Sequence, residues 1–364
     1  MISEVTGSPP QAKAAIAALP SYRPGRSAAQ AMAEHGLDSA IKLASNEVPW
    51  APLPAVAKAI ADAATGVNRY PDHGAAALRA AIATHLGVDA ERVAVGCGSV
   101  GLLQQLCLTY AGWGDEVVYG WRSFEAYPIL TQIAGAQGVT APLVNETIDA
   151  RNLVAALSRR TRLVLVANPN NPTGTAMTGR DLRFLAESLP EGCLLVVDEA
   201  YREFVRDPSI ADALDLLGHR PNVVVLRTFS KAHGLAALRV GYLVGAPEIV
   251  DAVDRTLIPF AVNALGQAGA MAALSVIDQT TTRIDELVAE RDRVMAAVRA
   301  FGLAAPASHA NFVWLPVRRA AVALAERLER EGVVARAFDG DGIRVTIGTH
   351  EENDRFLDAI RRCR

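Results

Sequence analysis

Lysine is scarce in this 364-residue sequence. Lysine and arginine together number 36, but only four are lysine, so arginine supplies 32 of the positive charges. Arginine serves wherever a permanent charge is enough, whereas lysine is needed where an amine must lose its proton and act as a nucleophile. The four lysines are Lys13, Lys42, Lys58 and Lys231. Only Lys231 stands where an apolar run, "NVVVL", gives way to a loop, so it is the first candidate for chemistry.

Cysteine is also rare, and no CxxC pair indicates a zinc site or a redox disulfide. The cysteines are Cys97, Cys107, Cys193 and Cys363. The seven histidines show no metal-ligand spacing, so we expect no bound metal. Unpaired thiols are typical of reducing compartments, and they favour a cytoplasmic protein.

Long apolar runs and blocks of one charge are missing as well. No uninterrupted stretch reaches the ~18 residues of a membrane-spanning helix, and residues 1–20 lack the charged and apolar regions of a secretory signal. The net charge is −3 with both signs interspersed, so no basic block suits nucleic acid. We therefore expect neither a membrane nor a nucleic-acid partner.

Apolar runs and helical patterns alternate from about residue 50. Helical periodicity occurs near 52–65, 74–86 and 99–111, whereas continuous runs such as "RLVLVANP" are typical of buried strands. Apolar strands separated by helices predict a mainly parallel sheet with helices on both faces, and hence an α/β fold. Beyond two long helices expected at about 262–279 and 281–301, the last segment indicates a smaller α+β domain.

Polar groups follow four of the apolar runs. "VAVGCGS" ends in a Gly-Ser turn, and the other three runs end in Asn171, in Asp198 and Tyr201, and in Ser230 and Lys231. Parallel strands bring their carboxyl ends to one edge of the sheet, where ligands of such folds bind. Each group alone has a structural explanation, such as a turn, a helix cap or a buried ring with a satisfied hydroxyl. Their joint occurrence at strand ends favours a shared site.

The chemistry of these groups matches one cofactor. A lysine amine can form an imine with an aldehyde, and a carboxylate in an apolar strand needs a cation such as a pyridinium nitrogen. An amide and a phenol can both hydrogen-bond a phenolate oxygen. A Gly-Ser turn at a helix start, with Ser230 and Arg239, can hold a phosphate. These ligand groups are those of pyridoxal 5'-phosphate, so the sequence predicts a site for this cofactor.

The motifs that carry these groups resemble those of the fold-type I aminotransferases, within the histidinol-phosphate and aromatic aminotransferase group. The resemblance covers nearly the whole chain, through "LASNE", "NRYPD", "NPNNPTG", "DEAY", "RTFSKAHGLAALRVGY" and "GIRVTIGT". "VAVGCGSV" and "GWRSFEAYP" look most like the actinobacterial aromatic, or phenylalanine, aminotransferases. The resemblance implies a large domain with a mainly parallel, seven-stranded-type sheet over residues 48–261. It implies a small α+β domain built from residues 1–47 and 262–364.

The same resemblance assigns roles at the cofactor. Lys231 would form the imine and move the proton, and Asp198 would pair with the pyridine nitrogen. Tyr201 and Asn171 would bind the phenolate oxygen, and Phe124 would stack on the ring. The residues expected at the phosphate are Gly98, Ser99, Val100, Ser230 and Arg239.

Further residues are implied around the substrate and at a subunit interface. Arg344 would clamp the substrate α-carboxylate, and Tyr22, Asn46 and Arg336 would line the substrate pocket. Tyr70 would reach the phosphate of the neighbouring subunit's cofactor, which implies a homodimer.

The implied reaction moves an amino group between phenylalanine or tyrosine and a 2-oxo acid such as 2-oxoglutarate, by a ping-pong mechanism. Histidinol-phosphate aminotransferase is the main alternative, but that branch often carries Asn and acidic residues where this chain reads "GCGSVG". A pyridoxal-phosphate decarboxylase of the phosphothreonine type shares the scaffold and stays open. A non-enzymatic regulator would usually carry an added DNA-binding domain, for which the first 40 residues are too few.

Overall fold

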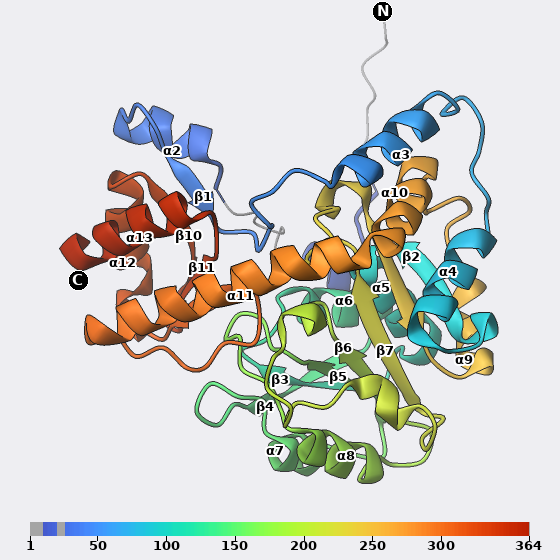
Figure 1. The fold of residues 1–364 in the computed structure, drawn as a ribbon. Coiled ribbons are helices and arrows are strands. Elements are labelled where there is room, and N and C mark those ends of the chain that lie inside the picture. Colours follow the sequence, from blue (N-terminus) through green and yellow to red (C-terminus); the bar gives the residue numbers. More distant parts are fainter. Residues whose placement is uncertain (1–9, 20–25, 364) are drawn as a thin grey trace, which may run out of the picture.

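Residues 10–19 and 26–363 are described by the computed structural model, and every structural statement concerns these residues. Tyr22, expected in the substrate pocket, lies outside them. The described chain forms one seven-stranded and one four-stranded sheet, each with its own helices (Figure 1). We call the part around the first sheet the large domain and the part around the second the small domain.

The large sheet is mainly parallel, as the sequence predicted. Its strands are β2 (Val93–Cys97), β3 (Glu116–Trp121), β4 (Gln137–Pro142), β5 (Thr161–Ala167), β6 (Leu194–Asp198), β7 (Val223–Thr228) and β8 (Val240–Val244). They lie in the order β2-β8-β7-β6-β5-β3-β4, and only β8 runs antiparallel to its neighbours. The start of β8 therefore lies at the edge where the parallel strands end.

Helices cover both faces of this sheet. They are α3 (Pro54–Ala64), α4 (Ala76–Leu86), α5 (Gly98–Tyr110), α6 (Ala126–Ala134), α7 (Ala150–Ala155), α8 (Gly179–Glu187), α9 (Pro247–Asp254) and α10 (Ala264–Ser275). Short 3-10 helices are η1 (Ala90–Arg92), η2 (Arg202–Phe204), η3 (Ala213–Leu216) and η4 (Ala236–Leu238). Helices α5, α6 and α9 contribute to the apolar cluster on one face, and α4, α7, α8 and α10 to that on the other.

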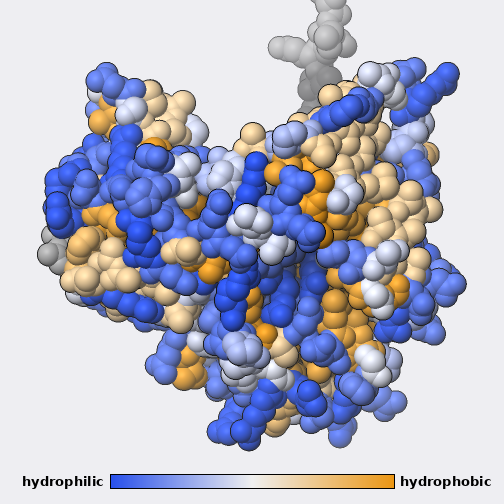
Figure 2. All heavy atoms as spheres, in the orientation of Figure 1, coloured by the Kyte–Doolittle hydropathy of each residue, from blue (hydrophilic) through white to orange (hydrophobic). Residues whose placement is uncertain are grey.

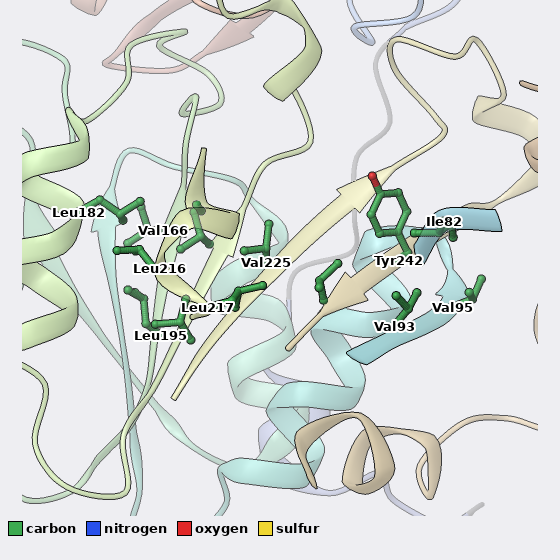
Figure 3. Close-up of a cluster of buried hydrophobic side chains, with 14 of the residues drawn as sticks. Ile82, Val93, Val95, Val166, Leu182, Leu195, Leu216, Leu217, Val225 and Tyr242 are labelled. Atoms are coloured by element: carbon green, nitrogen blue, oxygen red, sulfur yellow. The ribbon is translucent and has the colours of Figure 1, made fainter. Parts of the chain in front are cut away.

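Alternation along the strands explains the two clusters. In β5, Val164 and Val166 belong to one cluster, and Leu163 and Leu165 belong to the other. Successive strand side chains point to opposite faces, so a continuous apolar run indicates a strand buried on both sides. Figure 3 shows part of the first cluster, with Val166 of β5 near Leu195 of β6 and with Tyr242 of β8 farther along the sheet.

The small domain combines segments from both ends of the chain. It contains α2 (Ala28–His35), β1 (Ile41–Leu43), α11 (Ile277–Ala300), β9 (Phe312–Leu315), η5 (Arg318–Ala320), α12 (Ala321–Arg330), β10 (Val333–Phe338), β11 (Gly342–Thr346) and α13 (His350–Cys363). Its sheet has the order β1-β10-β11-β9, with β1 parallel to β10. The short helix α1 (Ala14–Ala17) precedes it.

Helix α10 bears on the domain boundary expected at residue 261. Its Ala270 and Ala273 lie in the large-domain cluster, and the helix packs against α3. We therefore propose that the small domain resumes at α11 instead of at residue 262. Helix α11 is the long helix that runs from the large domain across to the small one (Figure 1).

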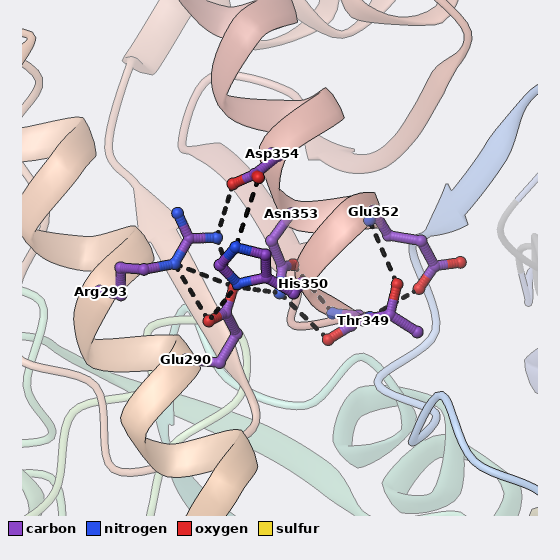
Figure 4. Close-up of polar contacts among 8 residues, drawn as sticks. Glu290, Arg293, Thr349, His350, Glu352, Asn353 and Asp354 are labelled. Carbon is purple, nitrogen blue, oxygen red and sulfur yellow. Dashed lines mark hydrogen bonds and ion pairs between the residues drawn. The ribbon is translucent and has the colours of Figure 1, made fainter.

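Polar contacts join α11 to α13 at the outer side of the small domain. Arg293 Nη2 lies 2.8 Å from Asp354 Oδ1, and Asn353 Nδ2 donates to Glu290 Oε1 at 3.1 Å (Figure 4). His350, at the start of α13, also contacts Glu290. Figure 2 shows that this side of the molecule is mostly hydrophilic, whereas hydrophobic side chains gather over α3 and α10. Within the described ranges, no helix has the length and apolar character needed to cross a membrane.

Candidate active site

A cavity opens at the edge of the large sheet where the parallel strands end, and the small domain closes its other side. Its volume is about 210 Å³, far above the ~10–15 Å³ that one water needs. Many residues expected from the sequence line it, namely Asn46, Ser99, Val100, Phe124, Asn171, Asp198, Tyr201, Ser230, Lys231, Arg239, Arg336 and Arg344. The geometry thus brings together residues from the two domains around one site.

One end of the cavity forms a cradle suited to an anion. Gly98 has φ 69°, and its amide donates to the Arg239 carbonyl oxygen at 3.0 Å. Arg239 Nη1 donates in turn to Ser230 Oγ at 3.2 Å. A Cβ at Gly98 would lie 2.5 Å from Arg239 Nη2, and one at Gly241 would lie 2.3 Å from the Ser99 amide. Glycine is required at both positions so that the first-turn amides of α5, a hydroxyl and a guanidinium can converge.

Asp198 ends strand β6 and is only 6% exposed. Its carboxylate accepts hydrogen bonds from the Ala200 amide at 3.2 Å and from the Tyr127 hydroxyl at 3.5 Å. Burial raises the pKa of Asp198 to about 6, because these neutral donors offset only part of the lost hydration. A cation placed in the cavity would stabilise the charged carboxylate.

Lys231 lies in the loop after β7, and its Nζ donates to the Ser45 carbonyl oxygen at 3.1 Å. Nζ also lies 6.0 Å from the centre of the Tyr201 ring. Burial, followed by the charge of Arg344, lowers the pKa of Lys231 to about 8. The lowered pKa makes the neutral, nucleophilic form of this amine more accessible near pH 7 than in an ordinary lysine.

A hydrogen-bond network connects the two domains beside Lys231. Asn46 Nδ2 donates to the Tyr201 hydroxyl at 2.9 Å, and Thr346 Oγ1 donates to Asn46 Oδ1 at 3.0 Å. The Asn46 amide donates back to Thr346 Oγ1 at 2.9 Å. Asn46 adopts φ 55°, a left-handed conformation that Asn tolerates better than most residues. The network holds Tyr201 in place from the small-domain side.

Arg344 connects strand β11 to the turn after β5. Its Nη1 donates to Asn171 Oδ1 and its Nη2 to the Ala44 carbonyl oxygen, both at 2.6 Å. Asn171 Oδ1 accepts the bond from Arg344. The Nδ2 group of Asn171 can then donate to a ligand oxygen. Arg336 also lines the cavity, and its Nη2 lies 3.0 Å from Glu125 Oε2.

Two aromatic residues were missed by sequence reasoning: Phe338, which lines the cavity, and Tyr127, which contacts the expected Phe124. The Phe124 ring packs edge-on against Tyr127, with centroids 5.7 Å apart. Tyr127 was missed although it follows Phe124 by three residues in "FEAYP", a spacing that places both near one helix face. Phe338 was also missed, because its run "GVVARAF" carries no polar strand end. Glu125 was not identified either, since its partner Arg336 is 211 residues away.

Tyr70 lies outside the cavity of its own chain. It is 81% exposed and stacks on Phe260, with ring centroids 4.4 Å apart. The segments that meet at this stack also expose the large apolar side chains Val67 and Ile258.

The residues of the cavity fit pyridoxal phosphate. The glycine-lined cradle, which a Cβ at Gly98 would fill, is suited to its phosphate. The buried Asp198 carboxylate, bonded to neutral donors, suits the protonated ring nitrogen. The Lys231 amine lines the same cavity and bonds to the Ser45 carbonyl oxygen, so it can reach the aldehyde of a cofactor bound there.

Comparisons with known proteins show the family of this chain. The family model described as "Aminotransferase class I and II" matches residues 38–360. The aromatic amino acid aminotransferase of Thermobifida fusca is 51% identical over 97% of both chains. That of Mycobacterium tuberculosis is 48% identical over 96% of this chain and 97% of its own. A histidinol-phosphate aminotransferase of Sinorhizobium meliloti, solved in complex with pyridoxal-5'-phosphate, is 30% identical with a TM-score of 0.89 over 98% of both chains. The chain belongs to the class I and II aminotransferase family, and its fold is that of the fold-type I enzymes.

Proposed function

We propose that this chain is an aromatic amino acid aminotransferase that uses pyridoxal phosphate. It moves the amino group between phenylalanine or tyrosine and a 2-oxo acid, with 2-oxoglutarate or glutamate as the second substrate. The cavity that joins Lys231, Asp198 and the glycine cradle carries this proposal. The full-length likeness to aromatic amino acid aminotransferases, at 51% identity, supports the substrate class.

Distinct residues would hold each part of the cofactor. The cradle of Gly98, Ser99, Val100, Ser230 and Arg239 would bind the phosphate. Asp198 would face the ring nitrogen, Asn171 and Tyr201 the phenolate oxygen, and Phe124 one face of the ring. When bound, pyridoxal phosphate supplies an aldehyde that takes up the amino group and a ring that accepts electrons from the substrate α-carbon.

The residues of the chain perform the remaining tasks. Lys231 would hold the cofactor through its side-chain amine, and the same amine would move a proton at the substrate α-carbon. Asp198 keeps a proton on the ring nitrogen, which it does best as a charged carboxylate. Arg344 binds the α-carboxylate through its planar fork and thereby orients the α-carbon. Because one amino group is handed over in each half-reaction, the kinetics are ping-pong.

An apolar wall favours an aromatic side chain over a phosphate. Val100, Phe124 and Phe338 line the cavity, so a substrate ring would bury apolar area worth about 25 cal/mol per Å². Histidinol phosphate carries a dianionic phosphate and no carboxylate, and the segment "GCGSVG" offers it no charged side chain. Arg344 could bind either anion, so it does not discriminate between the two substrates.

We propose that the enzyme is a homodimer in the cytoplasm with shared active sites. Tyr70 would extend to the phosphate of the partner's cofactor, which is supported by its 81% exposure. Exposed Val67, Ile258 and the Tyr70–Phe260 stack provide an apolar surface of the kind that subunit contacts cover. The four cysteines are free thiols, which suits a reducing compartment.

Competition between substrates on one preparation tests the function. We expect kcat/KM for phenylpyruvate or phenylalanine to exceed that for histidinol phosphate. A preference for histidinol phosphate would replace the aromatic assignment and leave the aminotransferase assignment standing. Release of carbon dioxide from an amino acid without transfer of its amino group would support a decarboxylase instead.

A further inference from the structure

We propose that Glu125 is a specificity-determining residue, which sets the balance between aromatic and dicarboxylic substrates through its ion pair with Arg336. This inference rests on the proposed function, in which the same cavity must accept an uncharged ring in one half-reaction and a second carboxylate in the other. Glu125 precedes α6 and lines the cavity opposite strand β10. Glu125 is not one of the residues that would hold the cofactor.

Two arginines stand side by side on the small-domain wall. Arg336 on β10 is in register with Arg344 on β11, so both side chains lie on the same face of the antiparallel pair. Each guanidinium carbon lies 5.7 Å from the centre of the Phe338 ring. Like charges directly opposite each other are destabilising unless one is compensated. Glu125 supplies that compensation at Arg336, with Nη2 and Oε2 3.0 Å apart.

The compensated arginine gives the wall two states. While Glu125 and Arg336 are paired, the wall carries no net charge at that position, and an apolar ring can lie against Phe338 and the guanidinium face. When a dicarboxylate is bound by Arg344 through its α-carboxylate, its second carboxylate can take the place of Glu125 on Arg336. Both side chains of the pair are partly exposed, at 19% for Arg336 and 35% for Glu125. The displaced Glu125 carboxylate can therefore be hydrated, and the exchange does not leave an unpaired charge buried.

The neighbouring ion pair provides a matched comparison. Arg122 and Asp341 connect the same loop and the same hairpin, with Nη2 and Oδ2 2.6 Å apart. Neither residue lines the cavity. Loss of this pair would weaken the connection between the domains as loss of the Glu125 pair would, but it would leave Arg336 compensated.

Binding of inert carboxylates to the holoenzyme tests the proposal. Glutarate stands in for the dicarboxylic substrate and 3-phenylpropionate for the aromatic one, and Kd is measured by calorimetry for the parent, Glu125→Gln and Asp341→Asn. We expect Glu125→Gln to bind glutarate about fivefold more tightly, the factor that corresponds to ~1 kcal/mol for a partly exposed ion pair. Affinity for 3-phenylpropionate should stay the same or fall. Asp341→Asn should keep the parent's ratio of the two constants.

Three outcomes would overturn the proposal. An unchanged ratio in Glu125→Gln would mean that Glu125 does not compete for Arg336. An equal shift in Asp341→Asn would assign the effect to the connection between the domains. A shift in Glu125→Gln with a matching change in 3-phenylpropionate affinity would indicate a general change of the cavity. The proposed function is tested separately, by phenylalanine turnover of the parent enzyme. If the parent does not turn over phenylalanine, the glutarate affinities still decide whether Glu125 competes for Arg336.

Discussion

Asn46 and Tyr201 lie 155 residues apart in the sequence, and the Asn46 side-chain amide donates a hydrogen bond to the Tyr201 hydroxyl at 2.9 Å. This bond joins the segment after β1 to the segment after β6. The Tyr201 hydroxyl oxygen, which lines the cavity, is the acceptor of this bond. The small domain thus contributes directly to the side of the cavity where the phenolate oxygen of the cofactor would bind.

Substitution of Lys231 should abolish transamination without unfolding the protein. We expect Lys231→Ala to hold pyridoxal phosphate only noncovalently, because the cradle and Asp198 remain. Lys231→Arg keeps the charge and should be equally inactive, since a guanidinium does not lose its proton. Borohydride treatment followed by peptide mass spectrometry should attach the cofactor to the Lys231 peptide in the parent and to neither variant. Substantial turnover in Lys231→Ala without added amines would disprove the assignment.

Replacement of Asp198 by Asn should lower turnover much more than it lowers cofactor occupancy. An amide cannot hold a proton on the ring nitrogen by charge, so we expect a loss on the order of 10²-fold or more in kcat. Occupancy, measured by absorbance after dialysis, should change by far less because the phosphate cradle is intact. A kcat within a few-fold of the parent's would mean that the carboxylate serves only the fold.

The same substitution should stabilise the cofactor-free protein. Burial raises the pKa of Asp198 from 3.8 to about 6, so the folded state binds more protons than the unfolded state between these values. Stability contributed by this group therefore falls as pH rises from about 4 to 6, and the penalty is complete above pH 6. At pH 7 the cofactor-free Asp198→Asn variant should gain up to ~3 kcal/mol in free energy of unfolding. Urea unfolding at pH 4 and 7 measures this, and an equal effect at both pH values would contradict it.

Gly98 offers a test of the phosphate cradle with a built-in control. Gly98→Ala would place a Cβ 2.5 Å from Arg239 Nη2, so Arg239 must move. Gly87 has the same kind of backbone, φ 68°, but nothing within 4 Å of an added Cβ. Both variants should lose ~1–2 kcal/mol of stability through the strained conformation. Only Gly98→Ala should also lose about tenfold or more in cofactor affinity, as expected for a lost charge-assisted hydrogen bond. Equal cofactor affinities in the two variants would show that the cradle does not hold the phosphate.

Subunit exchange tests whether Tyr70 acts across a dimer interface. Lys231→Ala and Tyr70→Ala dimers, each inactive or nearly so, are mixed and allowed to exchange. In a hybrid, one site then carries both defects and the other carries neither, so about a quarter of the parent's activity should return at statistical mixing. No recovery after exchange has been demonstrated by mass spectrometry would assign Tyr70 to its own subunit.

The strand ends were predictable from the sequence because their geometry is general. Asn171, Asp198 and Lys231 each follow an apolar run, and parallel strands must end at one edge. Strand β4, "QGVTAP", escaped the sequence pattern because it is a partly exposed edge strand without an apolar run. Helix α10 was expected in the small domain, but its small residues pack on α3, a partner that no periodicity specifies.

Contacts between segments that are distant in the sequence could not be predicted from the sequence. Glu125 and Arg336 are each ordinary charged residues in the sequence, and only the position of the β10–β11 hairpin over α6 makes them a pair. Asn46 was expected at the substrate, yet its bonds to Tyr201 and Thr346 depend on the register of strands from both chain ends. A single sequence contains no signal for the separation of such residues in space.

The pairing of β1 with β10 also governs when this enzyme becomes complete during its synthesis. Ile41 pairs with Val333, so the edge strand of the small-domain sheet emerges from the ribosome almost 300 residues before its partner. The large-domain strands, all within residues 93–244, can assemble while translation continues. The wall that contains Arg336 and Arg344 is made after these strands, and it can join the segment around Asn46 only then. A nascent chain can therefore build most of its cofactor cradle on the ribosome, but it acquires its substrate wall only about 100 residues after the last strand of the large sheet has been made.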